Sequence, residues 1–280
     1  MASPGPPRPS DYIAHHLTNL NTSGKAQTAM FDLSIVNLDT VFFATLTGIL
    51  GLWWMWSVAK KATYGAPGRS QAALEWLVEM VDNRAKKIIP NAGSRKFVAP
   101  VGLLVFIWVI LMNSMDFLPI DLLPTLWQLA WRDPGAYLKV VPTTDLSATL
   151  GLSGGVLIIC IWYTVKIKGI KGLVSSPFGN HPLLYLPNFV MQMIEFLAKA
   201  FSHGMRLWGN MYAGELIFML IALMGMYAPT LSLLSGSSLV LGHVVAGSAW
   251  AIFHILIIVL QAYIFMMLAL VYIGQAHEHH

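Results

Sequence analysis

The sequence predicts an all-α, polytopic membrane protein with about five membrane-embedded helices and one amphipathic surface helix, built as a single membrane domain over residues 1–280. The chain is 56% hydrophobic and only 11% charged, whereas ordinary globular domains are about 25% charged. Several apolar segments reach the roughly 20 residues that a helix needs to span hydrocarbon. One long segment, residues 216–277, contains no Asp, Glu, Lys or Arg. These features predict a chain that folds inside a bilayer.

The first half of the chain predicts three spans and one surface helix. Residues 1–35 form a polar, Pro-rich leader that lacks the apolar centre of a cleavable signal peptide. Apolar runs predict spans at residues 35–59, 97–115 and 147–165. Between the first two spans, residues 71–89 carry apolar side chains at roughly helical spacing. This spacing predicts an amphipathic helix on the membrane surface.

Basic residues concentrate in two of the loops and set the expected orientation. Eight lie in residues 60–96 and three in residues 166–171, whereas the acidic, Pro-broken loop 116–146 has only two. Loops rich in Lys and Arg stay on the cytoplasmic side of a membrane. We therefore expect the N-terminal leader and loop 116–146 in the periplasm, and the C-terminus in the cytoplasm. The same bias explains the net charge of +4 better than nucleic-acid binding does, so no nucleic-acid partner is expected.

The last two predicted helices, at about residues 186–228 and 237–274, are unusually long. Pro229 and the Ser- and Gly-containing residues around position 236 predict the turn between them. At 1.5 Å per residue the helices measure roughly 57–65 Å, about twice the hydrocarbon thickness of about 30 Å. They must therefore kink, or tilt well beyond the ordinary angle of about 20°. Residues 186–275 would form a long oblique hairpin.

Arg206 places a permanent charge at the edge of the most apolar part of the chain. Its guanidinium cannot lose its proton in a protein, and an Arg at a bilayer centre costs roughly 2.5–3.5 kcal/mol. Successive helical residues turn by about 100°, so Asn210 and Lys199 share the face of Arg206, whereas Glu215 points the opposite way. An ion pair within the helix is therefore excluded. Because the membrane part of the hairpin offers no further carboxylate except Glu195, the partner of Arg206 is a carboxylate on another chain, or else water or backbone carbonyls.

Glu215 needs a different partner, and the last helix supplies candidates. His254 and Gln261 are seven residues apart, so they share one helix face. Chains of Glu, Asp and His side chains within a membrane act as proton relays. A lone intramembrane His is more often a hydrogen bonder between packed helices. The two neighbouring polar groups favour the proton path.

Three aspartates lie at the non-cytoplasmic ends of spans, Asp116, Asp121 and Asp145. Each is either a cap at the membrane interface or part of a negatively charged mouth that attracts cations. Asn210 either packs between helices or lines the same path. The chain has no Gly-rich phosphate loop and no Cys and His residues at metal-ligand spacing. We therefore expect no cofactor, no metal, no directly bound nucleotide and no catalytic site of its own, and Cys160 reads as a small core hydrophobe.

Residues 206–215, RLWGNMYAGE, resemble the signature of subunit a, the stator channel subunit of rotary F-type ATP synthases. The similarity covers nearly the whole chain. It includes DYIAHHL at residues 11–17, LMNSMDFLPIDLLP at residues 111–124, KIKGIKG at residues 166–172 and WAIFHILIIVLQA at residues 250–262. The chain is most similar in pattern to the proteobacterial form of this subunit.

The resemblance implies a role for each matching residue. Arg206 would face the rotating ring of c subunits, beside the carboxylate of the ring. An aqueous half-channel from the periplasm would be lined by Glu215, His254, Gln261 and Asn210, with Asp116, Asp121 and Asp145 nearer its mouth. The cytoplasmic half-channel would be lined by Lys199, Ser202 and Glu195. Here the run KAFSHG at residues 199–204 departs from the Ser-Lys-Pro-like run of many relatives.

The implied function is a proton-channel stator subunit of the membrane sector. Two offset half-channels would deliver protons to and from the ring carboxylates and drive rotation, while Arg206 tunes the ring carboxylate and blocks a direct leak. The implied partners are the c-subunit ring, the b-subunit stator stalk, the remaining ATP synthase subunits and the lipid of a bacterial inner membrane. The alternative is a stand-alone secondary transporter that uses Arg206 to bind an anionic substrate. The sequence shows no internal repeat of the kind that many such transporters have.

Overall fold

A computed structural model describes the chain at residues 9–10, 13, 19–22, 35–89, 91–118, 122–132, 138–174, 185–228 and 233–275. Within these residues the regular structure is helical, with no strand and one isolated bridge between Asn21 and Asn37. Five of the described helices are long and apolar enough to cross a membrane. The all-α, polytopic fold class is therefore confirmed.

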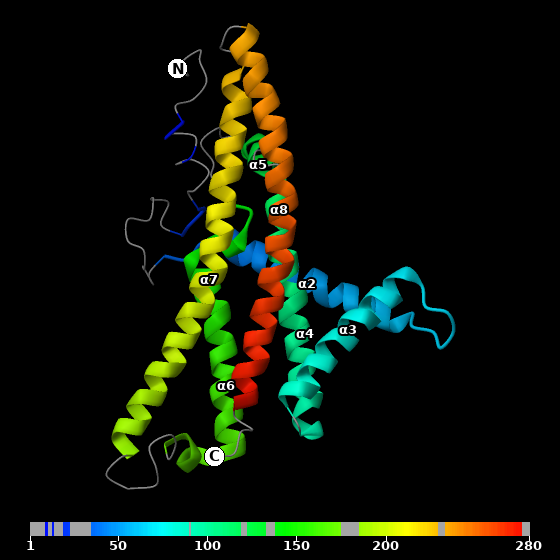
Figure 1. Cartoon of the computed structure of the whole chain (residues 1–280), viewed down its shortest axis with the longest axis vertical. Helices are drawn as coiled ribbons and strands as arrows, with labels where there is room; N and C mark the ends of the chain where they lie inside the picture. Colours follow the sequence, from blue (N-terminus) through cyan, green and yellow to red (C-terminus); the bar gives the residue numbers. More distant parts are fainter. Residues whose placement is uncertain are drawn as a thin grey trace. The chain divides into compact units, whose positions relative to one another are not determined.

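Three of these helices come from the first part of the chain (Figure 1). They are α2 (Leu38–Lys60), α4 (Ala92–Ser114) and α6 (Leu146–Val174). Their long apolar runs explain why they form, because each backbone polar group in hydrocarbon needs a partner within its own helix. In α2, Asp39 in the first turn and Lys60 in the last turn also complement the helix dipole.

The predicted amphipathic helix is α3 (Arg69–Ile88), which lies between α2 and α4 in the chain. Val81 and Ala85, one turn apart, are buried, whereas most of the other side chains of α3 are exposed or half-buried. On the exposed side, Lys86 pairs with Asp82 one turn earlier at 2.6 Å. The separation of buried and exposed faces confirms the amphipathic pattern.

The last two spanning helices have the expected length. Helix α7 (Tyr185–Tyr227) has 43 residues, and helix α8 (Leu233–Gly274) has 42. At 1.5 Å per residue each is roughly 63–65 Å long, about twice the hydrocarbon thickness of about 30 Å. A steep tilt in the membrane remains a prediction from this length.

Three details differ from the sequence-based expectation. A short helix, α5 (Leu122–Trp131), forms inside the Pro-broken loop 116–146, where we did not expect a helix. Pro124 falls in its first turn, where no hydrogen bond is lost. Helix α6 extends past residue 165 but is interrupted by a kink at Gly169, whose φ of 69° only glycine adopts easily. Helix α8 begins at Leu233, so the turn predicted around residue 236 is wrong. In the first turns of α8, the Ser238 hydroxyl donates to the Ser235 carbonyl at 2.9 Å.

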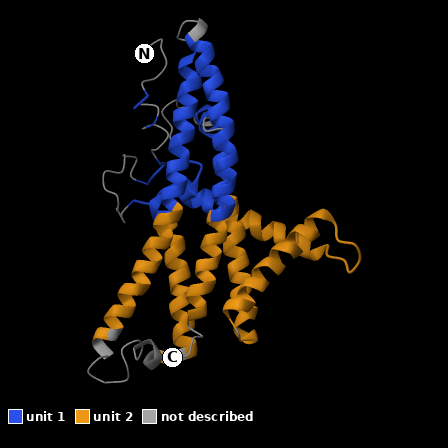
Figure 2. Cartoon of the chain, viewed as in Figure 1, with its two compact units in different colours: residues 1–46, 112–148, 208–260 blue, residues 47–111, 149–207, 261–280 orange. Residues whose placement is uncertain are grey.

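The chain divides into two compact units (Figure 2). Unit 1 comprises residues 1–46, 112–148 and 208–260, and unit 2 comprises residues 47–111, 149–207 and 261–280. In unit 1, Met219 and Leu223 of α7 belong to a buried apolar cluster. In unit 2, Gly102 lets α4 approach its neighbours closely, since a Cβ there would lie 3.1 Å from Leu270 of α8 and 3.6 Å from Val81 of α3.

Candidate functional site

Unit 1 buries an unusual number of ionisable side chains. Six of them are less than a tenth exposed among its described residues, and these are Asp39, Asp116, Lys139, Asp145, Glu215 and His254. An unpaired charge is very costly to bury. The contacts of these six groups therefore decide what the cluster can do.

His254 and Asp116 form the most deeply buried pair. His254 Nε2 on α8 lies 2.7 Å from Asp116 Oδ2, at the end of α4, and the two side chains are 0% and 3% exposed. The rings of Phe117 and Phe218 contact the imidazole edge to face, with centroids 5.6 Å and 5.1 Å away. A proton on this imidazole would make the contact an ion pair.

Helix α7 approaches this pair at a glycine. A Cβ added to Gly214 would lie 2.5 Å from His254 Cε1 and 3.7 Å from Asp116 Oδ2. Only glycine therefore fits between α7 and the imidazole ring. The next residue, Glu215, is buried, and its Oε2 lies 3.7 Å from Lys139 Nζ. The sequence led us to expect Glu215 and His254 as one group, and the structure gives each of them an oppositely charged or ionisable partner of its own.

The remaining aspartates have different surroundings. Asp145 lies just before α6. Its carboxylate accepts one hydrogen bond from the Ser147 backbone N–H at 2.9 Å and another from Asn37 Nδ2 at 2.8 Å. The first of these bonds caps the N-terminus of α6. Asp116 instead pairs with His254. Asp121 lies outside the described residues.

Arg206 lies in unit 2 and is exposed. Within the part of the chain that the structure describes, its guanidinium forms no ion pair and no hydrogen bond. Asn210, one turn later on α7 in unit 1, is exposed as well, whereas Glu215 is buried. This difference agrees with the opposite directions that helix geometry predicts for Arg206 and Glu215.

The residues expected toward the cytoplasm lie in unit 2. Lys199 Nζ contacts Glu195 Oε1 at 2.5 Å, one turn earlier on α7, and donates to Gln275 Oε1 at 2.8 Å. Ser202 is exposed. Gln261 is buried, 5% exposed, at the start of the part of α8 that belongs to unit 2. The structure thus groups Lys199 with Glu195 and leaves Ser202 apart from this pair.

Several buried polar residues were not among the sequence candidates. They include Asn37, Asp39, Asn113, Lys139 and His203. Of these residues, Lys139 could most easily have been singled out from the sequence, because it is one of only two basic residues in an acidic loop. His203 lies in the run that departs from the family pattern, and its ring packs on Phe265 with centroids 3.7 Å apart. Asn113 is fully buried one turn before Asp116.

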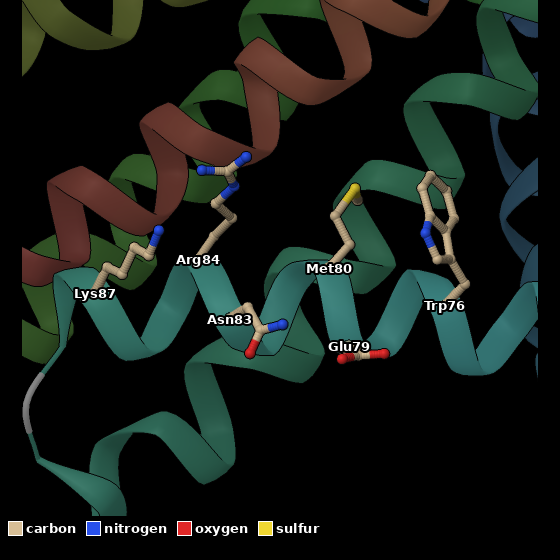
Figure 3. A pocket seen from close by; sticks show the side chains of 6 residues that line it. All are labelled: Trp76, Glu79, Met80, Asn83, Arg84 and Lys87. Atoms are coloured by element: carbon tan, nitrogen blue, oxygen red, sulfur yellow. The ribbon is translucent and has the colours of Figure 1, made fainter.

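A groove of about 380 Å³ lies elsewhere, along the exposed face of α3 (Figure 3). It is lined by Trp76, Glu79, Met80, Asn83, Arg84 and Lys87. The Arg84 guanidinium lies 5.8 Å from the Tyr263 ring of α8. None of the sequence-predicted site residues lines this groove, so we do not include it in the candidate site.

Comparison with known proteins decides the family. A family model described as ATP synthase A chain matches residues 41–274. The chain belongs to the ATP synthase subunit a family. It is 58% identical to ATP synthase subunit a of Acidovorax sp. over 284 residues, which cover 98% of each chain. It is 45% identical to that of Shewanella oneidensis over 286 residues, which cover 100% of each.

These comparisons confirm the family that the sequence motifs indicated. The chain matches both ATP synthase subunits a over nearly their full length, so the similarity is not confined to the motif around Arg206. Together with five helices long enough to span a membrane, they make this chain a multi-pass membrane subunit of an ATP synthase.

Proposed function

We propose that this chain is the proton-translocating stator subunit of its ATP synthase, with two offset half-channels that serve a rotating ring of c subunits. Family membership supports this function over a stand-alone secondary transporter. The observation that carries the proposal is Arg206, a permanent charge exposed on a long apolar helix, with no ion pair to any described residue of its own chain. Such a residue suits a carboxylate that another subunit supplies.

Protons from the periplasm reach the ring through the buried polar groups of unit 1. The pairs Asp116–His254 and Glu215–Lys139 each join a carboxylate to a nitrogen base or cation. An imidazole can bind a proton at one ring nitrogen and release it from the other, so His254 can pass a proton on. We assign Asn210 and Gln261 to the same half-channel, with Asp121 and Asp145 toward its mouth.

The ring carboxylate carries each proton through the lipid. A protonated carboxyl group is neutral, and it avoids the cost of a charge in hydrocarbon. After nearly a full turn, it loses its proton to the cytoplasmic half-channel, to which we assign Lys199, Ser202 and Glu195. Arg206 then stabilises the ionised carboxylate, because an opposite charge nearby favours the charged form.

Arg206 also separates the two half-channels. A fixed positive charge repels a proton that would cross directly from one half-channel to the other. Arg suits this role because it stays charged, whereas a buried Lys can lose its proton. The membrane potential then supplies about 2.3 kcal/mol per charge per 100 mV, and the ring must rotate for this energy to be used.

The proposal includes partners and an orientation. The c-subunit ring lies against the exposed side of α7 that carries Arg206, and the b-subunit stator stalk and the remaining subunits hold this chain against rotation. The membrane is a bacterial inner membrane. The excess of Lys and Arg in residues 60–96 and 166–171 supports a periplasmic N-terminus and a cytoplasmic C-terminus.

Purification from native membranes in a mild detergent distinguishes the stator subunit from a secondary transporter. We expect the chain to co-purify with a ring of small two-helix subunits, because the exposed Arg206 pairs with no carboxylate among the described residues of its own chain. A chain that purified alone and moved an anionic substrate in liposomes would contradict the proposed function.

Glu215→Gln and His254→Ala are expected to slow proton transfer through the periplasmic half-channel by about tenfold, a loss of roughly 1.4 kcal/mol in the transition state. Each change removes one proton-carrying group from the buried cluster. The measurement is ATP-driven acidification of inverted membrane vesicles, with the amount of assembled subunit determined in parallel. Glu79→Gln, an exposed change on α3, should leave the rate unaltered. Loss of the two variant proteins from the membrane would instead support a purely structural role for Glu215 and His254.

A further inference from the structure

Lys139 is a buried lysine of unit 1 that the sequence motifs do not explain. It is 6% exposed and lies three residues before the short helix η2 (Pro142–Thr144), which leads into α6. Lysines are almost never fully buried unless they are paired. The contacts of its side chain and of its backbone therefore indicate what it does.

The ammonium group of Lys139 is directed to Glu215. Lys139 Nζ lies 3.7 Å from Glu215 Oε2, and the two side chains are 5% and 9% exposed. The same ammonium lies 5.9 Å from the centroid of the Tyr212 ring, one turn earlier on α7. A buried charge pair is only weakly screened by salt, so the Lys139 ammonium attracts the Glu215 carboxylate at this distance.

The backbone of Lys139 is fastened to the start of α2. Asp39 Oδ2 accepts a hydrogen bond from the Lys139 N–H at 3.0 Å and another from the Leu20 N–H at 2.8 Å. Asp39 itself is only 2% exposed. A second bond, from Asn37 to Asp145 at 2.8 Å, ties the other end of the same loop segment to the residue just before α2. The ammonium is thus presented to Glu215 by a loop that is held on both sides.

We propose that Lys139 is a positioning residue of the periplasmic half-channel, where its ammonium holds the Glu215 carboxylate in place as an anion that accepts protons. The inference rests on the proposed function. Among the described residues of unit 1, the charged and titratable groups near Glu215 include Lys139 from the loop with Tyr212 of α7 beside it and, across Gly214, the pair of Asp116 and His254.

A purely structural role explains this pair less well. Apolar residues of similar volume often replace a buried ion pair with no loss of stability, so stability alone gives little reason for a lysine here. The separation of 3.7 Å also exceeds the roughly 2.7–2.9 Å of a short charge-assisted hydrogen bond. Lys139 therefore orients the carboxylate by its charge, without a short hydrogen bond that would compete with proton transfer.

The test compares Lys139→Met with Lys139→Arg in the whole ATP synthase, in inverted membrane vesicles. Two rates are measured, ATP-driven proton pumping and passive proton flow through the membrane sector after the catalytic sector is removed. We expect Lys139→Met to lower both rates about tenfold with a normal amount of assembled subunit, and Lys139→Arg to stay within about twofold of wild type, because Arg keeps the charge. Wild-type rates in Lys139→Met would overturn the proposal.

A double-mutant cycle separates positioning from packing. If Lys139 acts through Glu215, Lys139→Met causes little further loss of proton flow in a Glu215→Gln background, because the two residues are energetically coupled. The same fold-loss in both backgrounds would show that Lys139 does not act through Glu215. If Lys139→Met fails to assemble, Lys139→Gln, which keeps a polar side chain of intermediate length, takes its place in the same cycle.

Arg206→Ala, measured in the same vesicles, reports on the proposed function by itself. Normal pumping in Arg206→Ala means that the proposed function fails. Loss of pumping in Arg206→Ala, together with wild-type flow in Lys139→Met, overturns only the role of Lys139.

Discussion

Replacing Arg206 with Ala abolishes ATP-driven proton pumping and proton-driven ATP synthesis, according to the proposed function. In the proposed function, the exposed guanidinium is the group that faces the ionised ring carboxylate, and it forms no ion pair with a described residue of its own chain. Without it, the two half-channels also lose the charge that separates them. We therefore expect passive proton leak through the membrane sector to rise while coupled pumping falls to background. Both rates can be measured in inverted vesicles before and after removal of the catalytic sector.

Two further variants make the Arg206 prediction specific. Arg69→Ala removes another exposed Arg, at the start of α3, and should pump at the wild-type rate. Arg206→Lys keeps a charge on a flexible stem but loses the fixed fork of donors, so it should remain severely impaired. Wild-type coupling in Arg206→Ala would refute the role that we assign to this residue.

Gly214→Ala should reduce proton pumping at least tenfold, although it adds only one methyl group. That methyl carbon would lie 2.5 Å from His254 Cε1, so the imidazole ring must move by about 1 Å to reach ordinary contact. A misplacement of this size at a reacting group can cost roughly 100-fold in rate. Because His254 is fully buried among aromatic rings, it can move only by leaving its position at Asp116.

The matched control is Gly155→Ala on α6, where an added Cβ meets nothing within 4 Å. This variant should assemble and pump normally. Gly214→Ala should assemble in a normal amount and have reduced proton flow, as we expect for His254→Ala. If Gly214→Ala pumped at the wild-type rate, the close contact between α7 and His254 would have no functional importance.

The spanning helices could be predicted because their signal is local. Runs of about 20 apolar residues predicted α2, α4 and α6, and the much longer runs predicted the unusual length of α7 and α8. The pattern of buried Val81 and Ala85 in α3 likewise follows from helical spacing within one segment. No knowledge of distant contacts was needed for any of these elements.

The short helix α5 and the start of α8 were not predicted, because composition does not distinguish turns from helix starts. Prolines ruled out a straight continuous helix after α4 but gave no sign of α5, in which Pro124 occupies the first turn, a position where proline is tolerated. Ser- and Gly-rich residues predicted a turn near residue 236, yet they form the first turns of α8. Such residues are common both in turns and at helix starts, so the sequence alone favoured the wrong alternative.

The partners of the buried charges could not be predicted because they come from distant segments. Helical spacing correctly separated Arg206 from Glu215, since both lie on one helix. It could not indicate that Lys139, from a loop 76 residues earlier in the sequence, would approach Glu215. It likewise identified His254 as a candidate without identifying Asp116 as its neighbour. Each pairing depends on how loops and helix ends pack.

The most direct test of the central claim asks whether the face of α7 that carries Arg206 lies against the ring. Asn210→Cys, one turn from Arg206 on its exposed side, is made in a Cys160→Ala background together with a cysteine in the c subunit, one turn from its membrane carboxylate. Disulfide formation requires Cα atoms within roughly 4.4–6.8 Å. The account predicts an oxidant-induced product between the two subunits for Asn210→Cys and none for Met211→Cys, a neighbour that is fully buried. Cross-linking at Met211 but not at Asn210 would contradict it.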